Sequence, residues 1–316
     1  MTKVFCIGEL LIDFIAKNQG NNILKATNFT KKAGGAPANV ACAIAKLGGK
    51  SSFIGCLGKD PFGNFLLETL KNEEVDISMV QRSDIFTTLA FVSIAKNGER
   101  DFIFDRGADE LLTYDPSLKN EFLKNILHFG SATALLGGEL EKAYNHYLFD
   151  GLTKESFICF DPNFRSDLWK DNEADFIKKC MPYIEKSHLC KFSEEEALLL
   201  SGKEYVEDAC LFLHDIGASI ITVTLGKEGT YLSTKTTKQI VPSIKVSPID
   251  TTGAGDAFIG CLLYEISNLS NLESLYNDKE TLLKMVATAN KAGAITTTKF
   301  GAIEALPTRN QLEKMI

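Results

Sequence analysis

The feature that most constrains the fold is an alternation of short apolar runs with longer helical patterns along nearly the whole chain. Four of these runs have the length and content of buried strands: Val4–Ile7, Phe53–Leu57, Phe157–Phe160 and Ile220–Leu225. Between them lie helical stretches such as Pro37–Leu47, which has a proline in its first turn and glycines directly after its end. Strands that alternate with helices predict an α/β fold with a central, mostly parallel sheet covered by helices on both faces.

One region departs from this alternation. From Thr87 to Asp105 the pattern is strand, a turn at Lys96–Glu99, and strand, which is typical of a β-hairpin. Together with residues from about 13 to 32, the hairpin region of about 87 to 106 is predicted to form a small β-sheet lid beside the main body. Because no repeat, low-complexity tract or linker interrupts the 316 residues, we expect a single α/β domain spanning 1–316.

The overall charge argues against polyanionic partners. The formal net charge is -7, so the chain has no electrostatic reason to bind nucleic acid or an anionic membrane surface. No apolar run approaches the ~20 residues needed to span a bilayer, and the N-terminus lacks the pattern of a signal peptide. We therefore expect a cytoplasmic protein. The eight cysteines form no C-x-x-C pair and the four histidines are scattered, which predicts buried, reduced thiols and no zinc site.

The segment Asp250–Phe258 carries the strongest chemical signal. Its two glycines and an alanine leave the backbone bare where a loop turns into a helix, because apolar residues then continue at helical spacing from Phe258. We expect this helix to begin close to Gly253. The free N–H groups of a first helical turn carry partial positive charge, so they can stabilise the charge that develops on a transferring phosphoryl group.

Asp256 lies at this predicted helix start and has two interpretations. An acid in the first turn is favourable with the helix dipole and needs no function. Alternatively, a carboxylate beside an anion-binding loop can take the proton of an attacking hydroxyl as a phosphoryl group moves. The residue alone leaves both interpretations open.

Two motifs resemble those of the ribokinase-like (PfkB-type) sugar kinases. Thr251–Asp256 resembles the C-terminal signature of that family, and Gly34–Ala41, followed by Ala45–Gly48, resembles the N-terminal one. The resemblance extends from Gly8 to Pro307. It implies a ribokinase-like α/β fold with a small β lid and transfer of the γ-phosphoryl group of ATP to a sugar hydroxyl. In this reading Asp256 is the catalytic base, and Gly253, Ala254 and Gly255 form the anion hole.

Other nucleotide motifs are incomplete. Gly49-Lys50-Ser51 ends like a P-loop, but the required first glycine is Ile44. Gly253-Ala254-Gly255 does not extend to a dinucleotide-binding G-x-G-x-x-G, because position 258 is phenylalanine. A Walker-type NTPase and a Rossmann dehydrogenase are therefore not supported.

The resemblance also implies a sugar site. A carboxylate can accept hydrogen bonds from two vicinal hydroxyls, glycines allow close approach to the backbone, and an amide both donates and accepts. The implied contacts, besides Asp256 itself, are Asp13, Gly34, Gly35, Asn39, Phe104, Arg106 and Arg165. Each has a plain structural alternative, such as a solvated loop acid at Asp13 or an ion pair at Arg165.

The nucleotide and metal positions follow in the same way. The resemblance places ATP against Ser193, Glu196, Thr224, Gly226, Gly229, Gly253, Gly255, Asn290 and Gly293. It implies that Glu196 orders the water shell of Mg²⁺, although Ser193 stands where many relatives have asparagine. It also implies a K⁺ site, mostly of backbone carbonyls, at Asp250, Thr252, Thr296, Lys299 and Gly301, with Ala305 replacing a hydroxyl-bearing residue.

Within the family, the motifs look most like the fructokinase branch, which implies transfer to the 6-hydroxyl of fructose. A 2-keto-3-deoxygluconate kinase shares much of the set and remains an alternative, with Arg106 or Arg165 binding the substrate carboxylate. Ribokinase fits less well because its motif has lysine in place of Ala36. A non-catalytic sugar or nucleotide sensor is the alternative of another class. Because lids pair in relatives, we expect a homodimer.

Overall fold

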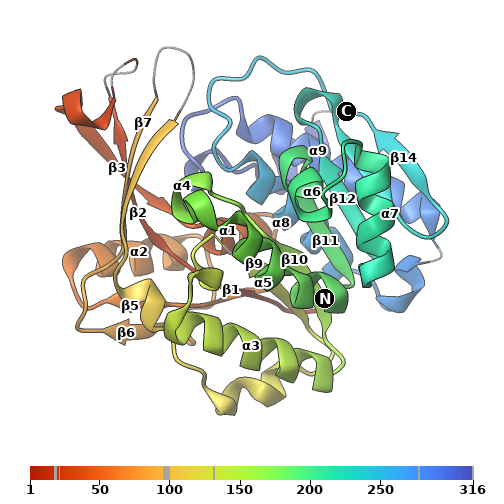
Figure 1. Cartoon of the computed structure of the whole chain (residues 1–316), viewed down its shortest axis with the longest axis horizontal. Helices are drawn as coiled ribbons and strands as arrows, with labels where there is room; N and C mark the ends of the chain where they lie inside the picture. The colour runs from red at the N-terminus through yellow and green to blue at the C-terminus, as the bar shows by residue number, and fades with distance from the viewer. Residues whose placement is uncertain (18–19, 21, 95–99, 131, 277, 315–316) are drawn as a thin grey trace.

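The computed structural model describes residues 1–17, 20, 22–94, 100–130, 132–276 and 278–314. Figure 1 shows a main body built on a large sheet, with a small sheet standing at its left side. The large sheet has eight strands in the order β14-β13-β12-β11-β10-β9-β1-β4. In that order they are Lys238–Val241, Thr230–Ser233, Ile220–Thr224, Leu189–Ser193, Phe157–Asp161, Ile126–Gly130, Val4–Ile7 and Ser51–Ile54.

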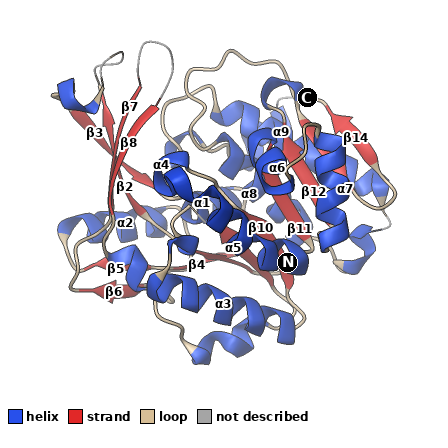
Figure 2. Ribbon diagram, viewed as in Figure 1, coloured by secondary structure: helices blue, strands red, loops and turns tan. Residues whose placement is uncertain are grey.

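The large sheet confirms the predicted mostly parallel arrangement. The six strands from β12 to β4 run parallel, β13 runs antiparallel to them, and β14 pairs antiparallel with β13. In β1, Val4 and Cys6 belong to one hydrophobic cluster and Phe5 and Ile7 to the other, so the sheet buries both faces. Figure 2 shows helices on either side of this sheet.

Two groups of helices provide these layers. The first cluster contains residues of α1 (Ala36–Lys46), α8 (Ala254–Ser267) and α9 (Lys279–Thr296). The second contains residues of α3 (Gly138–Thr153), α5 (Glu173–Lys186), α6 (Glu194–Ser201) and α7 (Val206–Ile216). Shorter or peripheral elements are α2 (Pro61–Asn72), α4 (Ser166–Trp169), α10 (Arg309–Lys314), β5 (Cys56–Gly58) and β6 (Gln81–Ser83).

The predicted small sheet is confirmed as well. It has four strands in the order β3-β2-β7-β8, which are Phe29–Gly34, Leu11–Ala16, Leu89–Ile94 and Arg100–Asp105. The hairpin strands β7 and β8 pair antiparallel, with Leu89 opposite Asp105. The predicted turn at Lys96–Glu99 lies outside the described residues. The first segment is somewhat longer than predicted, because β2 begins at Leu11 and β3 ends at Gly34.

The predicted strand Phe53–Leu57 is wrong as a single element. β4 ends at Ile54 in the large sheet, and β5 begins at Cys56 and pairs with β6 in a separate two-stranded sheet. Gly55 separates them at a crowded point, since a Cβ there would lie 2.5 Å from Phe53 Cε1 and 2.6 Å from the Gly8 carbonyl oxygen. The apolar run therefore serves two sheets. The other predicted strands and the Pro37–Leu47 helix agree with the structure to within one residue.

Asp60 ties the entry of the hairpin to α2. Its Oδ1 accepts hydrogen bonds from the amides of Phe62 (2.8 Å) and Gly63 (3.0 Å), which caps the helix. Its Oδ2 accepts from both the amide and the hydroxyl of Thr87, each at 2.8 Å. This single carboxylate thus fixes the chain just before β7.

The cysteine prediction is confirmed, since all eight thiols are free and buried. Burial raises the pKa of Cys190 to about 12, for example, which keeps that thiol protonated at neutral pH. Among the described residues, none of the helices combines the length and the apolar content that a bilayer-spanning segment needs.

Candidate active site

A cavity of about 680 Å³ opens at the carboxyl ends of the parallel strands, beside the small sheet. One wall comes from residues at or just after the ends of β1, β10, β11 and β12, including Glu9, Asn163, Ser193 and Thr224. The opposite wall comes from the small sheet and includes Asp13 and Phe104. The carboxyl edge of a parallel sheet is where α/β proteins generally bind their ligands.

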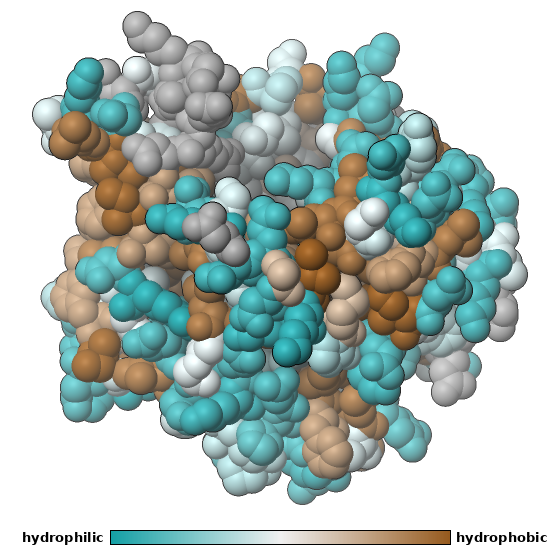
Figure 3. All heavy atoms as spheres, viewed as in Figure 1, coloured by the Kyte–Doolittle hydropathy of each residue, from teal (hydrophilic) through white to brown (hydrophobic). Residues whose placement is uncertain are grey.

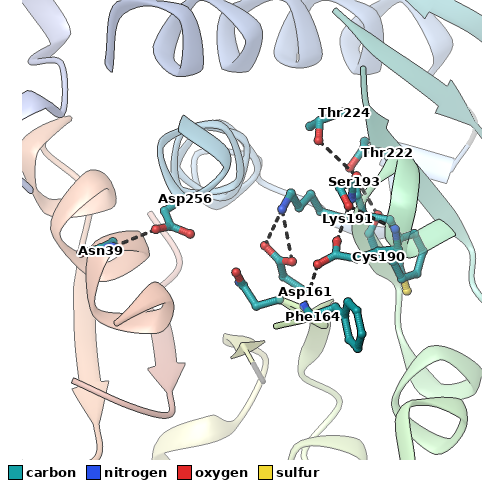
Figure 4. Close-up of polar contacts among 12 residues, drawn as sticks. Asn39, Asp161, Phe164, Cys190, Lys191, Ser193, Thr222, Thr224 and Asp256 are labelled. Carbon is teal, nitrogen blue, oxygen red and sulfur yellow. Dashed lines mark hydrogen bonds and ion pairs between the residues drawn. The ribbon is translucent and has the colours of Figure 1, made fainter. Parts of the chain in front are cut away.

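Asp256 lies in this cavity, in the first turn of α8. Its Oδ2 accepts a 2.8 Å hydrogen bond from Asn39 Nδ2 of α1, as Figure 4 shows. Burial raises the pKa of Asp256 above its usual value, although the Asn39 hydrogen bond and the charges of Lys191 and Arg165 act in the opposite direction. A half-buried, oriented carboxylate with a raised pKa is suited to accept a proton.

The start of α8 forms the predicted anion-binding turn. The helix begins at Ala254, as predicted, with Gly253 as N-cap at φ +76°. The amides of Ala254 and Ala257 donate to Thr251 O and Gly253 O, whereas those of Gly255 and Asp256 have no acceptor among the described residues. Free amides at a helix N-terminus bind anions.

The glycines of the N-terminal motif lie against polar groups of the predicted sugar site. A Cβ at Gly34 would lie 1.9 Å from Asp13 Oδ2, and a Cβ at Gly35, which has φ +114°, would lie 2.5 Å from the Glu9 carbonyl oxygen. Asp13, Gly35 and Asn39 line the cavity, and Gly34 lies directly behind the Asp13 carboxylate. The structure therefore brings this predicted group together.

The aromatic and basic candidates divide into two groups. Phe104 lines the cavity, as does Arg165, whose guanidinium donates to Phe164 O (2.9 Å) and Asn163 Oδ1 (3.0 Å). Arg106 is not among the lining residues. Its guanidinium donates to Thr133 O at 3.0 Å and lies 3.5 Å from an Asp109 oxygen.

Ser193 and Glu196 line the cavity and also form a capping box at the start of α6. Ser193 Oγ accepts from the Glu196 amide (3.1 Å), and Glu196 Oε2 accepts from the Ser193 amide (2.7 Å). Glu196 Oε1 accepts from the Phe164 amide at 2.8 Å. Each carboxylate oxygen keeps a further lone pair, so this side chain fits a role in holding water molecules of a Mg²⁺ shell.

The remaining nucleotide candidates lie at different distances from the cavity. Thr224 lines it, but Gly226, Gly229, Asn290 and Gly293 do not. Asn290 accepts from the Thr230 hydroxyl (2.6 Å) and donates to Val241 O (2.8 Å), so it ties α9 to β13 and β14. A Cβ at Gly293 would lie 3.1 Å from Ala254 O, which places this glycine behind the anion-binding turn.

Asp250 joins the two loops predicted to hold a monovalent cation. Its Oδ1 accepts from the amide (3.0 Å) and hydroxyl (2.7 Å) of Thr252, and its Oδ2 accepts from the Gly301 amide at 3.0 Å. These three residues line the cavity, whereas Thr296 and Lys299 do not. Within the described part of the chain, no group of three or more His, Cys, Asp or Glu residues is arranged to bind a metal ion.

Three charged residues of the site received no role in the sequence prediction. Lys191 lines the cavity, and its Nζ lies 3.1 Å from Asp161 Oδ2 (Figure 4). Burial raises the pKa of Asp161, although the charge of Lys191 acts in the opposite direction, and burial raises the pKa of Glu9, which also lines the cavity, to about 7. The sequence feature that could have pointed to these three residues is a charged side chain inside or beside the apolar run of a buried strand, as in Leu189–Ser193.

The comparisons with known proteins agree with the fold and with the family that the motifs resemble. The family model for pfkB family carbohydrate kinases matches residues 1–309. The fold and site are thus those of a phosphotransferase that acts on an alcohol group. The chain belongs to the pfkB family of carbohydrate kinases, as its motifs predicted.

Individual relatives are similar over their full length. Fructokinase-1 of Zea mays is 38% identical over 319 residues, which cover 99% of this chain and 97% of the relative. A fructokinase double mutant of Vibrio cholerae O395, solved with fructose, ADP and potassium ion, has a TM-score of 0.88 at 33% identity, covering 99% and 98% of the two chains. A fructokinase of Xylella fastidiosa with bound ATP has a TM-score of 0.88 at 29% identity, with the same coverage.

Proposed function

We propose that this kinase transfers the γ-phosphoryl group of ATP to the 6-hydroxyl of fructose. The observation that carries the proposal is the Asp256 carboxylate, which lines the cavity beside the free amides of the α8 N-terminus and is held by Asn39. The relatives named fructokinase, one of them with bound fructose and ADP, support the choice of sugar.

The proposed mechanism is a direct in-line transfer. Asp256 accepts the proton of the attacking hydroxyl, and the amides at the α8 N-terminus stabilise the charge on the moving phosphoryl group. Glu196 would hold water molecules of a Mg²⁺ shell, and Mg²⁺ would supply neutralisation of negative charge during the transfer. The small sheet covers the sugar and excludes water, which would otherwise compete as acceptor.

The two arginines differ in what they could offer to a 2-keto-3-deoxygluconate carboxylate. A carboxylate substrate needs a guanidinium with free donors, ideally for a bidentate contact. Arg106 is engaged with Thr133 and Asp109 and does not line the cavity, and Arg165 already donates to Phe164 O and Asn163 Oδ1. Arg106 therefore does not border the cavity, whereas Arg165 borders it and keeps N–H donors beyond these two contacts, so of the two only Arg165 could bind a substrate carboxylate there.

A coupled ADP-release assay with ATP and Mg²⁺ tests this proposal across fructose, 2-keto-3-deoxygluconate, ribose, glucose and adenosine. We expect kcat/KM for fructose to exceed that for every other acceptor. A preference for the keto-acid would leave the proposed mechanism unchanged and would mean that the arginines determine the substrate specificity. Sugar binding without turnover would support a sensor and contradict the proposal.

We further propose K⁺ as an activator bound between the two loops that Asp250 joins. The Asp250 contacts to Thr252 and Gly301 hold these loops together beside the anion-binding turn, and a solved relative contains potassium ion. Replacement of K⁺ by Li⁺ in the assay is expected to lower kcat, because Li⁺ is too small for carbonyl ligands spaced for K⁺. Equal rates in both salts would contradict a cation role for this site.

The small sheet is also our proposed homodimer interface. Its edge strand β8 exposes Ile103 (51%), and Leu24 beside β3 is 88% exposed; Figure 3 shows apolar surface in this part of the molecule, at the left. Exposed sheet edges with apolar residues tend to pair. Light scattering after size exclusion is expected to give twice the monomer mass, and Ile103→Lys is expected to shift the protein toward monomer. A wild-type monomer at micromolar concentration would contradict this proposal.

We place the enzyme in the cytoplasm, where cysteines stay reduced. Eight free, buried thiols suit a reducing compartment. Fractionation of cells that express the tagged protein is the corresponding measurement, and recovery with the membrane fraction would contradict the assignment.

A further inference from the structure

Lys191 is a buried cation in the wall of the cavity. It lies in the central strand β11, and its side chain is only 8% exposed. Its ammonium contacts both oxygens of Asp161, at 3.1 and 3.3 Å. In Figure 4 the side chain extends from β11 toward the helix that carries Asp256, with Asp161 to one side.

Gly255 shows how close this ammonium comes to the anion-binding turn. A Cβ at position 255 would lie 3.1 Å from Lys191 Nζ and 3.6 Å from Cε, and it would meet no other heavy atom within 4 Å apart from its neighbours. Unlike Gly253, this residue has no positive φ that would require glycine. A glycine within a helix costs roughly 1 kcal/mol relative to alanine. The absence of a side chain at Gly255 therefore leaves room for the Lys191 ammonium and for a ligand bound beside it.

The charges around Lys191 leave it both protonated and available. Burial alone would lower the pKa of Lys191, but Asp161, Glu196 and Asp256 outweigh that effect and raise it. An ammonium group has three N–H donors, and the contacts with Asp161 use at most two of them. One donor therefore remains for an oxygen atom in the cavity, next to the free amides of Gly255 and Asp256.

We propose that Lys191 is a catalytic residue whose ammonium binds an oxygen of the transferring phosphoryl group, opposite the amides of the α8 N-terminus. This inference rests on the proposed phosphoryl transfer at this site. The bond from the γ-phosphorus to the bridging oxygen of ADP breaks, and the bond to the sugar oxygen forms. The hydroxyl proton goes to Asp256, and Lys191 keeps its three protons throughout. Asp161 is a positioning residue that holds the ammonium in place.

A purely structural role would make Lys191 the counter-ion of Asp161 and nothing more. The decisive comparison is therefore between Asp161→Asn and the double variant Lys191→Met/Asp161→Asn. Both lack the ion pair and neither leaves a buried carboxylate at position 161, so they differ only in the ammonium. We expect the double variant to lose a further ~10²–10³-fold in kcat relative to Asp161→Asn, with KM for fructose changed by less than about threefold.

A binding measurement provides a readout independent of turnover. Calorimetry with Mg²⁺, fructose and ADP is expected to give similar affinities for both variants, because ADP lacks the transferred group. Fluoroaluminate mimics the phosphoryl group in the transition state of transfer. Its addition is expected to tighten ADP binding to Asp161→Asn but not to the double variant.

Equal kcat values in the two variants, or equal tightening by fluoroaluminate, would show that the ammonium is only structural and would overturn the inference. The proposed function has a separate control, since Asp256→Asn tests the base. If Asp256→Asn is inactive while Asp161→Asn and the double variant are alike, only the role of Lys191 fails. If Asp256→Asn keeps full turnover, the proposed site itself is wrong.

Discussion

Replacing Asp256 by asparagine is expected to lower kcat for fructose by ~10²–10⁴-fold, because asparagine cannot accept the hydroxyl proton. Asparagine has nearly the same shape and can still accept the hydrogen bond that Asn39 donates at 2.8 Å. The affinity for fructose, measured by calorimetry without ATP, is therefore expected to change by less than about tenfold. Steady-state kinetics with ATP and Mg²⁺ measure the loss, and near-normal turnover would rule out Asp256 as the base.

The same substitution is expected to maintain or raise the melting temperature at pH 7. Burial raises the pKa of Asp256 in the folded state, so ionisation of this carboxyl costs more free energy in the folded protein than in the unfolded chain. The contribution of Asp256 to the free energy of unfolding therefore decreases as the pH rises from its pKa in the unfolded chain through its pKa in the folded protein. Asparagine does not ionise, so the variant does not show this decrease. Thermal unfolding followed from about pH 4 upward is expected to show the melting temperature of the variant rising relative to that of the wild type.

Asp60 provides a matched control, since it is also an acid at a helix start. Its hydrogen bonds from Gly63, Thr87 and Phe62 outweigh burial and lower its pKa, so its ionised form stabilises the fold at neutral pH. Asp60→Asn is expected to lower the melting temperature and to keep kcat within about twofold. Opposite effects of the two substitutions on stability and turnover would separate a chemical role from a capping role. Similar effects would argue that Asp256 is structural.

The parts of the site that the sequence predicted are those determined locally. The α8 N-terminus follows from glycines beside an apolar helical repeat, and its start agrees with the structure to within one residue. The hairpin β7–β8 likewise follows from a turn pattern between two strand patterns. Such features depend on residues a few positions apart, so a single sequence is sufficient to find them.

Contacts between distant segments could not be predicted in the same way. The ion pair of Lys191 with Asp161 exists because β10 and β11 are neighbours in the sheet, and strand order is not visible in either strand's sequence. The position of Arg106, directly after the end of β8, had the same difficulty, because its contacts with Thr133 and Asp109 are made to other segments of the chain. Gly55 was missed because its role depends on the approach of Gly8 from another strand.

Gly253→Ala is expected to lower kcat by about 10²-fold, because small displacements of groups that stabilise the transition state carry costs of this order. Gly253 has φ +76°, where a Cβ adds roughly 1–2 kcal/mol of strain. A Cβ there would also lie 2.9 Å from both Cα and Cβ of Ala302, so the turn or its neighbour must move.

Gly202→Ala is the matched control. Gly202 is also left-handed, at φ +64°, but a Cβ there meets nothing within 4 Å. Both variants are expected to lose similar stability from backbone strain, measured by denaturant unfolding, whereas only Gly253→Ala is expected to lose turnover. A Gly253→Ala enzyme with full kcat would mean that the geometry of this turn does not limit phosphoryl transfer.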